Sequence, residues 1–193
     1  MESPLRKVAP LLAALAFSSL ACPDTIGQLC PTGTSTAGQF TVTLTLQHPP
    51  DTCAITQDAD GGALDGSLGA ESQKFGATLC SGLAGDGGAL VYLAVLNHGT
   101  RQSPLGADAG FMFSSSSTSV LGTACNCALD INESINGNLY GPDGGVSPDA
   151  DGGLANVVAI GGTLVDRVAP SSDAGGCWCN VPCALSYSLS GQK

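Results

Sequence analysis

Cysteine places the tightest limit on what this chain can fold into. The sequence of 193 residues contains nine cysteines. An even set in an exported chain of this size is typical of a disulfide framework, and an odd set requires an explanation. If one cysteine is used by another chemistry, the other eight can form four disulfides, whose pairing the sequence alone leaves open. The nine are Cys22, Cys30, Cys53, Cys80, Cys125, Cys127, Cys177, Cys179 and Cys183.

The beginning of the chain has the pattern of an export signal. Arg6 and Lys7 precede an apolar run over residues 8–20, VAPLLAALAFSSL. This run is too short to cross a bilayer core of about 30 Å. A basic start, a short apolar segment and small residues at its end are typical of a secretory signal peptide. We therefore expect residues 1–21 to be removed.

Two cleavage patterns compete at the end of this segment. Ser19 and Ala21 supply the small residues that an ordinary signal peptidase requires. The stretch SSLACPD also resembles the lipobox of bacterial lipoproteins, in which an aliphatic residue, a small residue and Gly or Ala precede Cys. Ala21 and Cys22 match that box, whereas Leu20 and Ser19 are transposed. Because lipidation of Cys22 also leaves an even set of cysteines, we expect the lipoprotein pattern to apply.

That expectation has a consequence for location. Two or more acyl chains hold a protein stably at a membrane, whereas one holds it only marginally. The resemblance to bacterial lipoproteins implies at least two chains on Cys22, and therefore a lipid-anchored protein of the cell envelope, with the outer membrane as its expected place.

The charge of the chain excludes several classes of partner. Removal of residues 1–21 changes 16 acidic and six basic residues to 15 and four, a net charge of −11. A nucleic-acid-binding surface needs clustered Lys and Arg. The four remaining basic residues are instead scattered, so we expect no nucleic-acid partner and membrane contact through the anchor alone. They are Lys74, Arg101, Arg167 and Lys193.

The residue types favour strands and turns over helices. The chain has 27 Gly and 11 Pro, and its acidic residues are mostly Asp, which prefers turns, rather than Glu, which suits helix surfaces. Short Asp-Gly units recur, among them DADGG at 58 and at 149, and such pairs suit tight turns between strands. They resemble the Asp-Ala-Gly and Asp-Gly-Gly units that recur in many secreted lipoproteins of myxobacteria. We expect an all-β sandwich or barrel-like domain over residues 38–193, joined to Cys22 by a tether over residues 22–37.

Five segments have the pattern of strands. The first alternates cleanly between apolar and Thr side chains, and the second is continuously apolar, which predicts a strand covered on both faces. The third is polar and predicts a sheet edge. In the fourth, Gly161 and Gly162 predict a bulge or bend. The pattern of residues 63–83 is ambiguous, and a short helix over residues 69–75 is one alternative there. The five segments are residues 38–47, 89–96, 111–121, 154–165 and 183–191.

The densest cysteine group is formed by CNC at 125 and CWC at 177. Cys125 and Cys127 would point the same way on a strand, so the two groups can bridge neighbouring segments side by side. We expect Cys30 to attach the tether to the domain. Cys-x-Cys groups also bind zinc or copper as thiolates, but disulfides are favoured outside the cytoplasm. We therefore expect eight disulfide-bonded cysteines, no metal and no cofactor.

Calcium is the alternative ligand, because of the DADGG units. An EF-hand loop needs an oxygen ligand at position 5 and Glu at position 12. Counted from Asp58 or Asp149, position 5 is Gly in both loops, and position 12 is Gly69 or Ile160. Neither loop fits, so a calcium-dependent module would need a looser site built from two turns.

Catalytic patterns are sparse. GDGGAL at 85 lacks the serine of the protease motif that it resembles, and no Gly-x-Ser-x-Gly elbow occurs. Glu133 falls on an apolar strand face, which predicts either an outward turn or an ion pair with Arg101 or Arg167. A hydrolase site around Glu133, His48 or His98 is the remaining alternative. We therefore expect a non-enzymatic binding or structural domain, whose protein or glycan ligand the sequence does not identify.

Overall fold

The structure is a computed structural model that describes residues 30–47, 53–57, 63–95, 99–121, 125–171 and 176–193. All regular secondary structure in these residues is β, as the composition predicts. The strands are β1 (Ser35–Leu46), β2 (Ala54–Gln57), β3 (Ala63–Ser67), β4 (Ser72–Leu83), β5 (Ala89–Val95), β6 (Gly99–Pro104), β7 (Gly110–Leu121), β8 (Cys127–Tyr140), β9 (Ala159–Pro170) and β10 (Cys183–Gln192).

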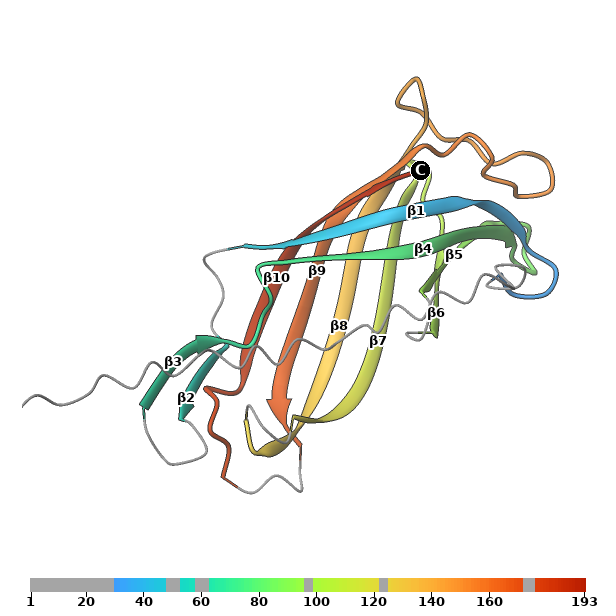
Figure 1. Cartoon of the computed structure of the whole chain (residues 1–193). Coiled ribbons are helices and arrows are strands. Elements are labelled where there is room, and N and C mark those ends of the chain that lie inside the picture. The colour runs from blue at the N-terminus through green and yellow to red at the C-terminus, as the bar shows by residue number, and fades with distance from the viewer. Residues whose placement is uncertain (1–29, 48–52, 58–62, 96–98, 122–124, 172–175) are drawn as a thin grey trace, which may run out of the picture.

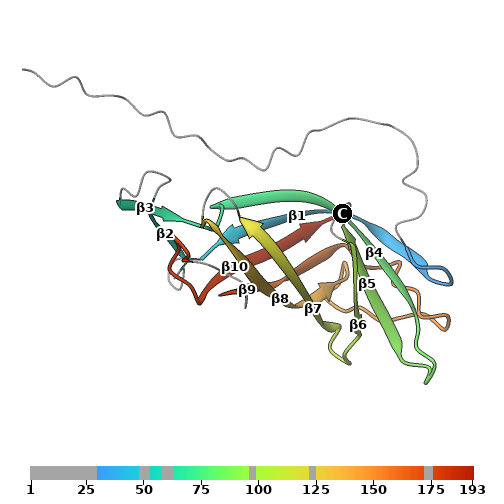
Figure 2. The ribbon, with the colours of Figure 1, turned by 90° about the horizontal axis from the view of Figure 1, so that it is seen from below.

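Eight of these strands form one antiparallel sheet in the order β6-β5-β4-β1-β10-β9-β8-β7, and β2 and β3 form a separate hairpin. The two edge strands, β6 and β7, are consecutive in the chain. The short turn between them holds the two edges of the sheet close together, so the sheet curls almost into a closed barrel (Figures 1 and 2). Of the two expected architectures, the barrel is the one adopted.

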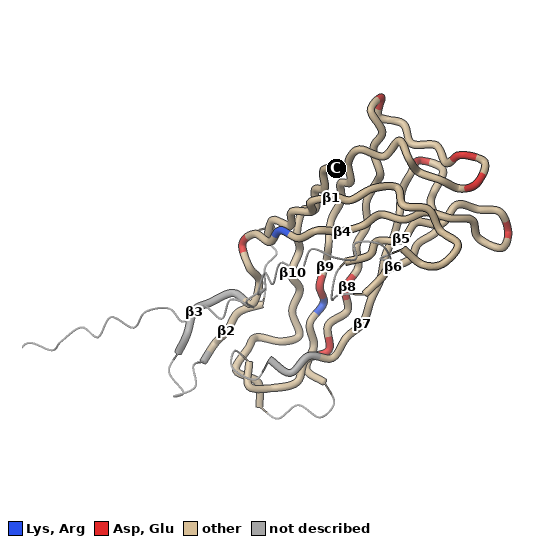
Figure 3. The backbone as a smooth tube through the Cα atoms, turned by 45° about the vertical axis from the view of Figure 1, so that its right-hand side comes forward, with Lys and Arg blue, Asp and Glu red and all other residues tan. Residues whose placement is uncertain are grey.

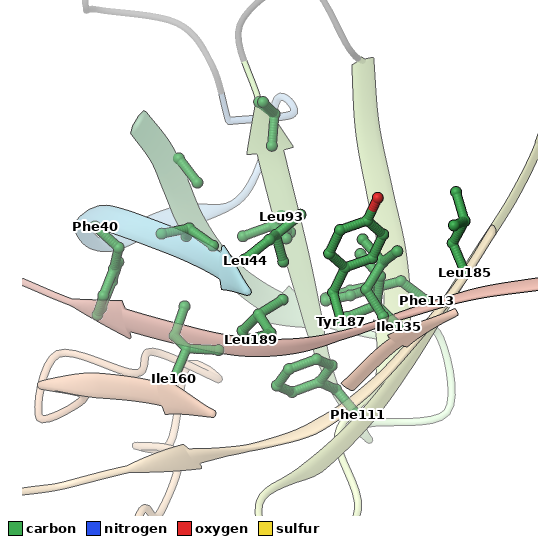
Figure 4. Packing of buried hydrophobic residues seen from close by; sticks show 14 of the residues in the cluster. Phe40, Leu44, Leu93, Phe111, Phe113, Ile135, Ile160, Leu185, Tyr187 and Leu189 are labelled. Atoms are coloured by element: carbon green, nitrogen blue, oxygen red, sulfur yellow. The ribbon is translucent and has the colours of Figure 1, made fainter. Parts of the chain in front are cut away.

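Strict alternation fills the inside of this barrel. On β1, Phe40, Val42, Leu44 and Leu46 are buried, while Thr residues between them face outward. Side chains of β10, β8, β7 and β5 meet them from the other walls, and Figure 4 shows this packing around Tyr187. Each fully buried aliphatic or aromatic side chain stabilises the fold by about 1.5–3 kcal/mol, so the interior is the main source of stability.

The barrel has two unlike ends. The turns after β4, β6 and β8 all lie at one end, where Figure 3 shows a concentration of acidic residues. The β2–β3 hairpin lies at the other end (Figure 1). We call the first the acidic end; its exposed carboxylates are Asp86, Asp108, Asp143, Asp149 and Asp151.

The start of the domain differs slightly from the sequence-based boundary. β1 begins at Ser35, so the last three residues of the expected tether belong to the first strand. Cys30 is bonded to Cys80 on the outward side of β4, and the Thr34 side chain lies against Gly82. The segment from Cys30 to Thr34 therefore covers part of the outer surface of the barrel, and Cys80 is fully buried beneath it.

The predicted strands are found, whereas neither the alternative helix over residues 69–75 nor a bulge at Gly161 and Gly162 is formed. The segment proposed as a helix leads into β4, because its residues pair with β1 from Ser72 onward. The glycines of β9 do not mark a bulge, since its registers with β8 and β10 run without a shift. They allow close approach instead: a Cβ on Gly162 would collide with the backbone oxygen of Asn136. The β9 strand itself begins at Ala159, later than predicted.

The predicted character of β5 and β7 is confirmed. β5 lies between β4 and β6, and both the inward Leu93 and the outward Ala94 are buried. β7 is a terminal strand of the sheet, as its polar sequence predicts.

Candidate functional site: a charged cluster at the barrel seam

The barrel is closed by side chains where its two edge strands meet. β6 has six residues and β7 has twelve, and no backbone ladder joins them within the described residues. Their turn is held by a hydrogen bond from Gly106 N to Gly110 O of 2.8 Å. Beyond it, the Met112 N–H donates to the buried Ser103 hydroxyl at 2.9 Å. We call this junction the seam.

An ion pair crosses the inside of the barrel at the seam. Arg101 Nε on β6 donates to Glu133 Oε1 on β8 at 2.6 Å, and both side chains are largely buried, with 13% and 18% exposed. The Ser115 hydroxyl of β7 donates to the same oxygen at 3.1 Å. Glu133 therefore lies on the inward face of its strand, and of the alternatives that the sequence left open the ion pair with Arg101 is the one that forms.

A second carboxylate faces this pair. Asp166 of β9 lies directly opposite Glu133 in the β8–β9 ladder. Its pKa is raised from the ordinary value of 3.8 to about 6, mainly because burial disfavours the charged form and also because the negative charge of Glu133 lies nearby. Arg101 lowers the pKa, but by less. Asp166 thus changes charge close to neutral pH.

Sequence reasoning missed Asp166. The signal was present, because Ile160, Leu164, Asp166 and Val168 share one strand phase and the other three are buried. The sequence does not show that β8 and β9 are neighbours, so it gives no reason to pair Asp166 with Glu133. Paired carboxylates of unequal environment are a feature of acid–base sites. Here the Glu133 carboxylate of β8 also accepts hydrogen bonds from Arg101 of β6 and Ser115 of β7, so the cluster links three strands and has a structural role in closing the seam.

Four disulfides reinforce the fold, and together they use all eight cysteines expected to pair. Cys125–Cys179 and Cys127–Cys177 lie side by side, as the two Cys-x-Cys groups predict, and Cys53–Cys183 lies at the same end of the barrel. Cys30–Cys80 ties down the start of the domain, also as predicted.

The end of the barrel that holds these three disulfides, which we call the disulfide end, is extended by backbone pairing. Ile55 of β2 forms a bridge with Cys179. Thr56 N donates to Trp178 O at 2.7 Å, and Asn180 N donates to Ala54 O at 2.8 Å. The segment between β9 and β10 therefore holds the β2–β3 hairpin in place, and Trp178 is half-buried there.

The other candidate residues are either outside the described part of the chain or placed in a turn away from the cluster. Cys22, His48, His98 and the DADGG unit at 58 lie outside the described residues. Asp149 is described, and its Oδ1 accepts the N–H groups of Asp151 and Gly153 within its own turn. Among the described residues, no three His, Cys, Asp or Glu side chains are grouped in a way that could hold a metal ion.

A shallow depression of about 380 Å³ lies on the outside of the barrel near the disulfide end. Asn132, Arg167 and Pro182 contribute to its lining. It lies on the opposite side of the wall from the inward Glu133 and Asp166, so it gives no access to their carboxylates.

Comparison with protein-family models, with curated proteins and with solved structures finds no match for this chain. Within the described residues, no helix is long and apolar enough to span a bilayer. The site must therefore be interpreted from its own geometry.

Proposed function

We propose that this protein is an exported, lipid-anchored domain of the cell envelope that acts by binding or as a structural element rather than by catalysis. The observation that carries the proposal is the number of cysteines that form disulfides. Eight cysteines pair with one another, so Cys22 is the one cysteine for which the framework supplies no partner. A framework of this density is typical of an oxidising compartment, and lipidation would use the ninth thiol.

The absence of an accessible acid–base pair in the described barrel supports the non-catalytic part. The Glu133 carboxylate is engaged by Arg101 and Ser115 and is largely buried, and the inward Asp166 lies opposite it in the β8–β9 ladder. A hydrolytic site needs space for a substrate beside its acid and base. The barrel interior is instead occupied by packed apolar side chains.

The test is the intact mass of the protein extracted from a membrane fraction, before and after alkylation without reductant. We expect a chain that begins at Cys22, carries lipid and contains no alkylated thiol. The matched variant Cys22→Ser should leave the membrane fraction while keeping its four disulfides. A wild-type protein that carries no lipid and one alkylated thiol would contradict the proposal.

A further inference from the structure

The two edges of the sheet are protected to very different degrees. Natural β-proteins shield edges with short strands, charges, prolines or bulges, because an open edge pairs readily with another strand. β6 is short, contains Arg101 and ends at Pro104. β7 has twelve residues, contains neither a charged residue nor a proline, and pairs with β8 at every position without a register shift. β7 thus has none of these protections.

The middle of β7 is also uncovered. Ser114, Ser115, Ser116, Ser117 and Thr118 are all exposed, although Ser115 and Ser117 belong to the inward phase of the strand. In a closed barrel, inward residues of a wall strand are buried by the next strand. Their exposure shows that β6 leaves this stretch of the edge open, and no described strand pairs with β7 on the side away from β8.

We propose that this edge pairs with the same edge of a second copy of the chain, β7 against β7, antiparallel about a two-fold axis. Backbone N–H and C=O groups then form a continuous ladder across the two barrels, as in strand addition to an exposed edge. A two-fold arrangement uses one self-complementary surface on each subunit and closes after two copies.

The sequence of the edge suits a copy of itself. An antiparallel two-fold pairing brings Ser and Thr side chains opposite one another, which form cross-strand hydrogen bonds, and it places no like charges in opposition. A run of small hydroxyl residues also allows close approach of the two strands. These properties hold when the axis lies at Ser116, in the middle of the run, where Ser115 faces Ser117 and Ser114 faces Thr118.

The charge distribution selects the antiparallel arrangement. All five exposed carboxylates of the acidic end lie beyond one end of β7 (Figure 3). Antiparallel pairing places the two acidic ends at opposite ends of the dimer, separated by roughly the 40 Å length of a twelve-residue strand. That distance is several times the screening length of about 8 Å at physiological ionic strength, so the ends hardly repel. Parallel pairing would bring them together.

The experiment is sedimentation velocity on the chain carrying Cys22→Ser, which removes the thiol that lipid would modify, from micromolar to submillimolar concentration. We expect a reversible dimer. Ser116→Lys places two cations near each other across the two-fold axis and should weaken dimerisation roughly tenfold or more. The matched control is Asn136→Lys, an exposed outward position on the neighbouring interior strand β8, which should leave the dimer unchanged.

Hydrogen exchange provides a second measurement. Amides of β7 should exchange more slowly at concentrations where the dimer is populated, whereas those of β6 should not. A chain that stays monomeric at submillimolar concentration, a dimer that Ser116→Lys does not weaken, or open polymers formed by pairing β7 with β6 would each overturn the proposal. None of these results depends on whether Cys22 carries lipid.

Discussion

At the scale of single residues, Asp166 makes the stability of the barrel depend on pH. Its pKa in the folded state, about 6, lies above the ordinary value of 3.8. Between these values the folded protein holds a proton on Asp166 that the unfolded chain has lost, so the contribution of Asp166 to stability is most favourable at acid pH and falls as pH rises toward 6. Above that range the carboxylate is charged in both states, and the full cost of burying it remains.

Asp166→Asn should therefore stabilise the protein at pH 7.5 and have little effect at pH 4. The shift corresponds to at most about 3 kcal/mol, and partial solvent access reduces the expected gain to about 1–2 kcal/mol. Urea denaturation at the two pH values measures it, with the exposed Asp143→Asn as control. An equal gain at both pH values would show that the effect is not electrostatic.

At the scale of elements, the β8–β9 pair depends on glycines that face each other. Gly137 and Gly162 are partners in the ladder, and a Cβ on Gly137 would meet the ring of Phe111 at 2.7 Å as well as the backbone of Gly161. Side chains here would force the strands apart, so the glycines are needed for close packing rather than for an unusual backbone angle.

Gly162→Ala should destabilise the protein by at least about 2 kcal/mol, because a backbone oxygen cannot move aside as a flexible side chain can. The matched control is Gly76→Ala on β4, where a Cβ would meet no atom within 4 Å. That change should stay within about 1 kcal/mol of the wild type. Thermal and urea unfolding of both variants measure the two losses of stability. Similar losses would exclude the close approach of β8 and β9 as the cause.

At the scale of the whole molecule, disulfides of equal loop length should differ in their effect. Cys30–Cys80 and Cys127–Cys177 both span 50 residues. Cys30–Cys80 closes its loop alone, which contributes about 4 kcal/mol in the chain-entropy account. Cys127–Cys177 lies beside Cys125–Cys179, so it closes only a small further loop, worth about 2 kcal/mol.

Removing each bridge by paired Cys→Ala substitutions should therefore cost about twice as much for Cys30–Cys80 as for Cys127–Cys177. Equilibrium denaturation of the two variants, compared with the fully oxidised protein, tests this difference. If the second variant loses as much as the first, then packing around the buried sulfurs, rather than chain entropy, governs the contribution of these bridges.

The sequence by itself determined the class of the fold and much of its strand content. Alternation along residues 38–47 and 183–191, the apolar run at 89–96 and the polar edge at 111–121 all correspond to strands of the predicted character. These properties are local, because a strand places successive side chains on opposite faces whatever lies next to it. The cysteine count also indicated a framework of four disulfides before any partner was known.

Only the tertiary structure decided which strands are neighbours, and with that the closure of the barrel, the disulfide pairing and the site at the seam. Asp166 shares its strand phase with apolar residues in the sequence, but its raised pKa arises only because β9 buries it inside the barrel and places it opposite Glu133. Gly162 suggested a bulge until its neighbour across the ladder was known. Each of these properties depends on contacts between residues far apart in the chain, which a pattern of period two cannot specify.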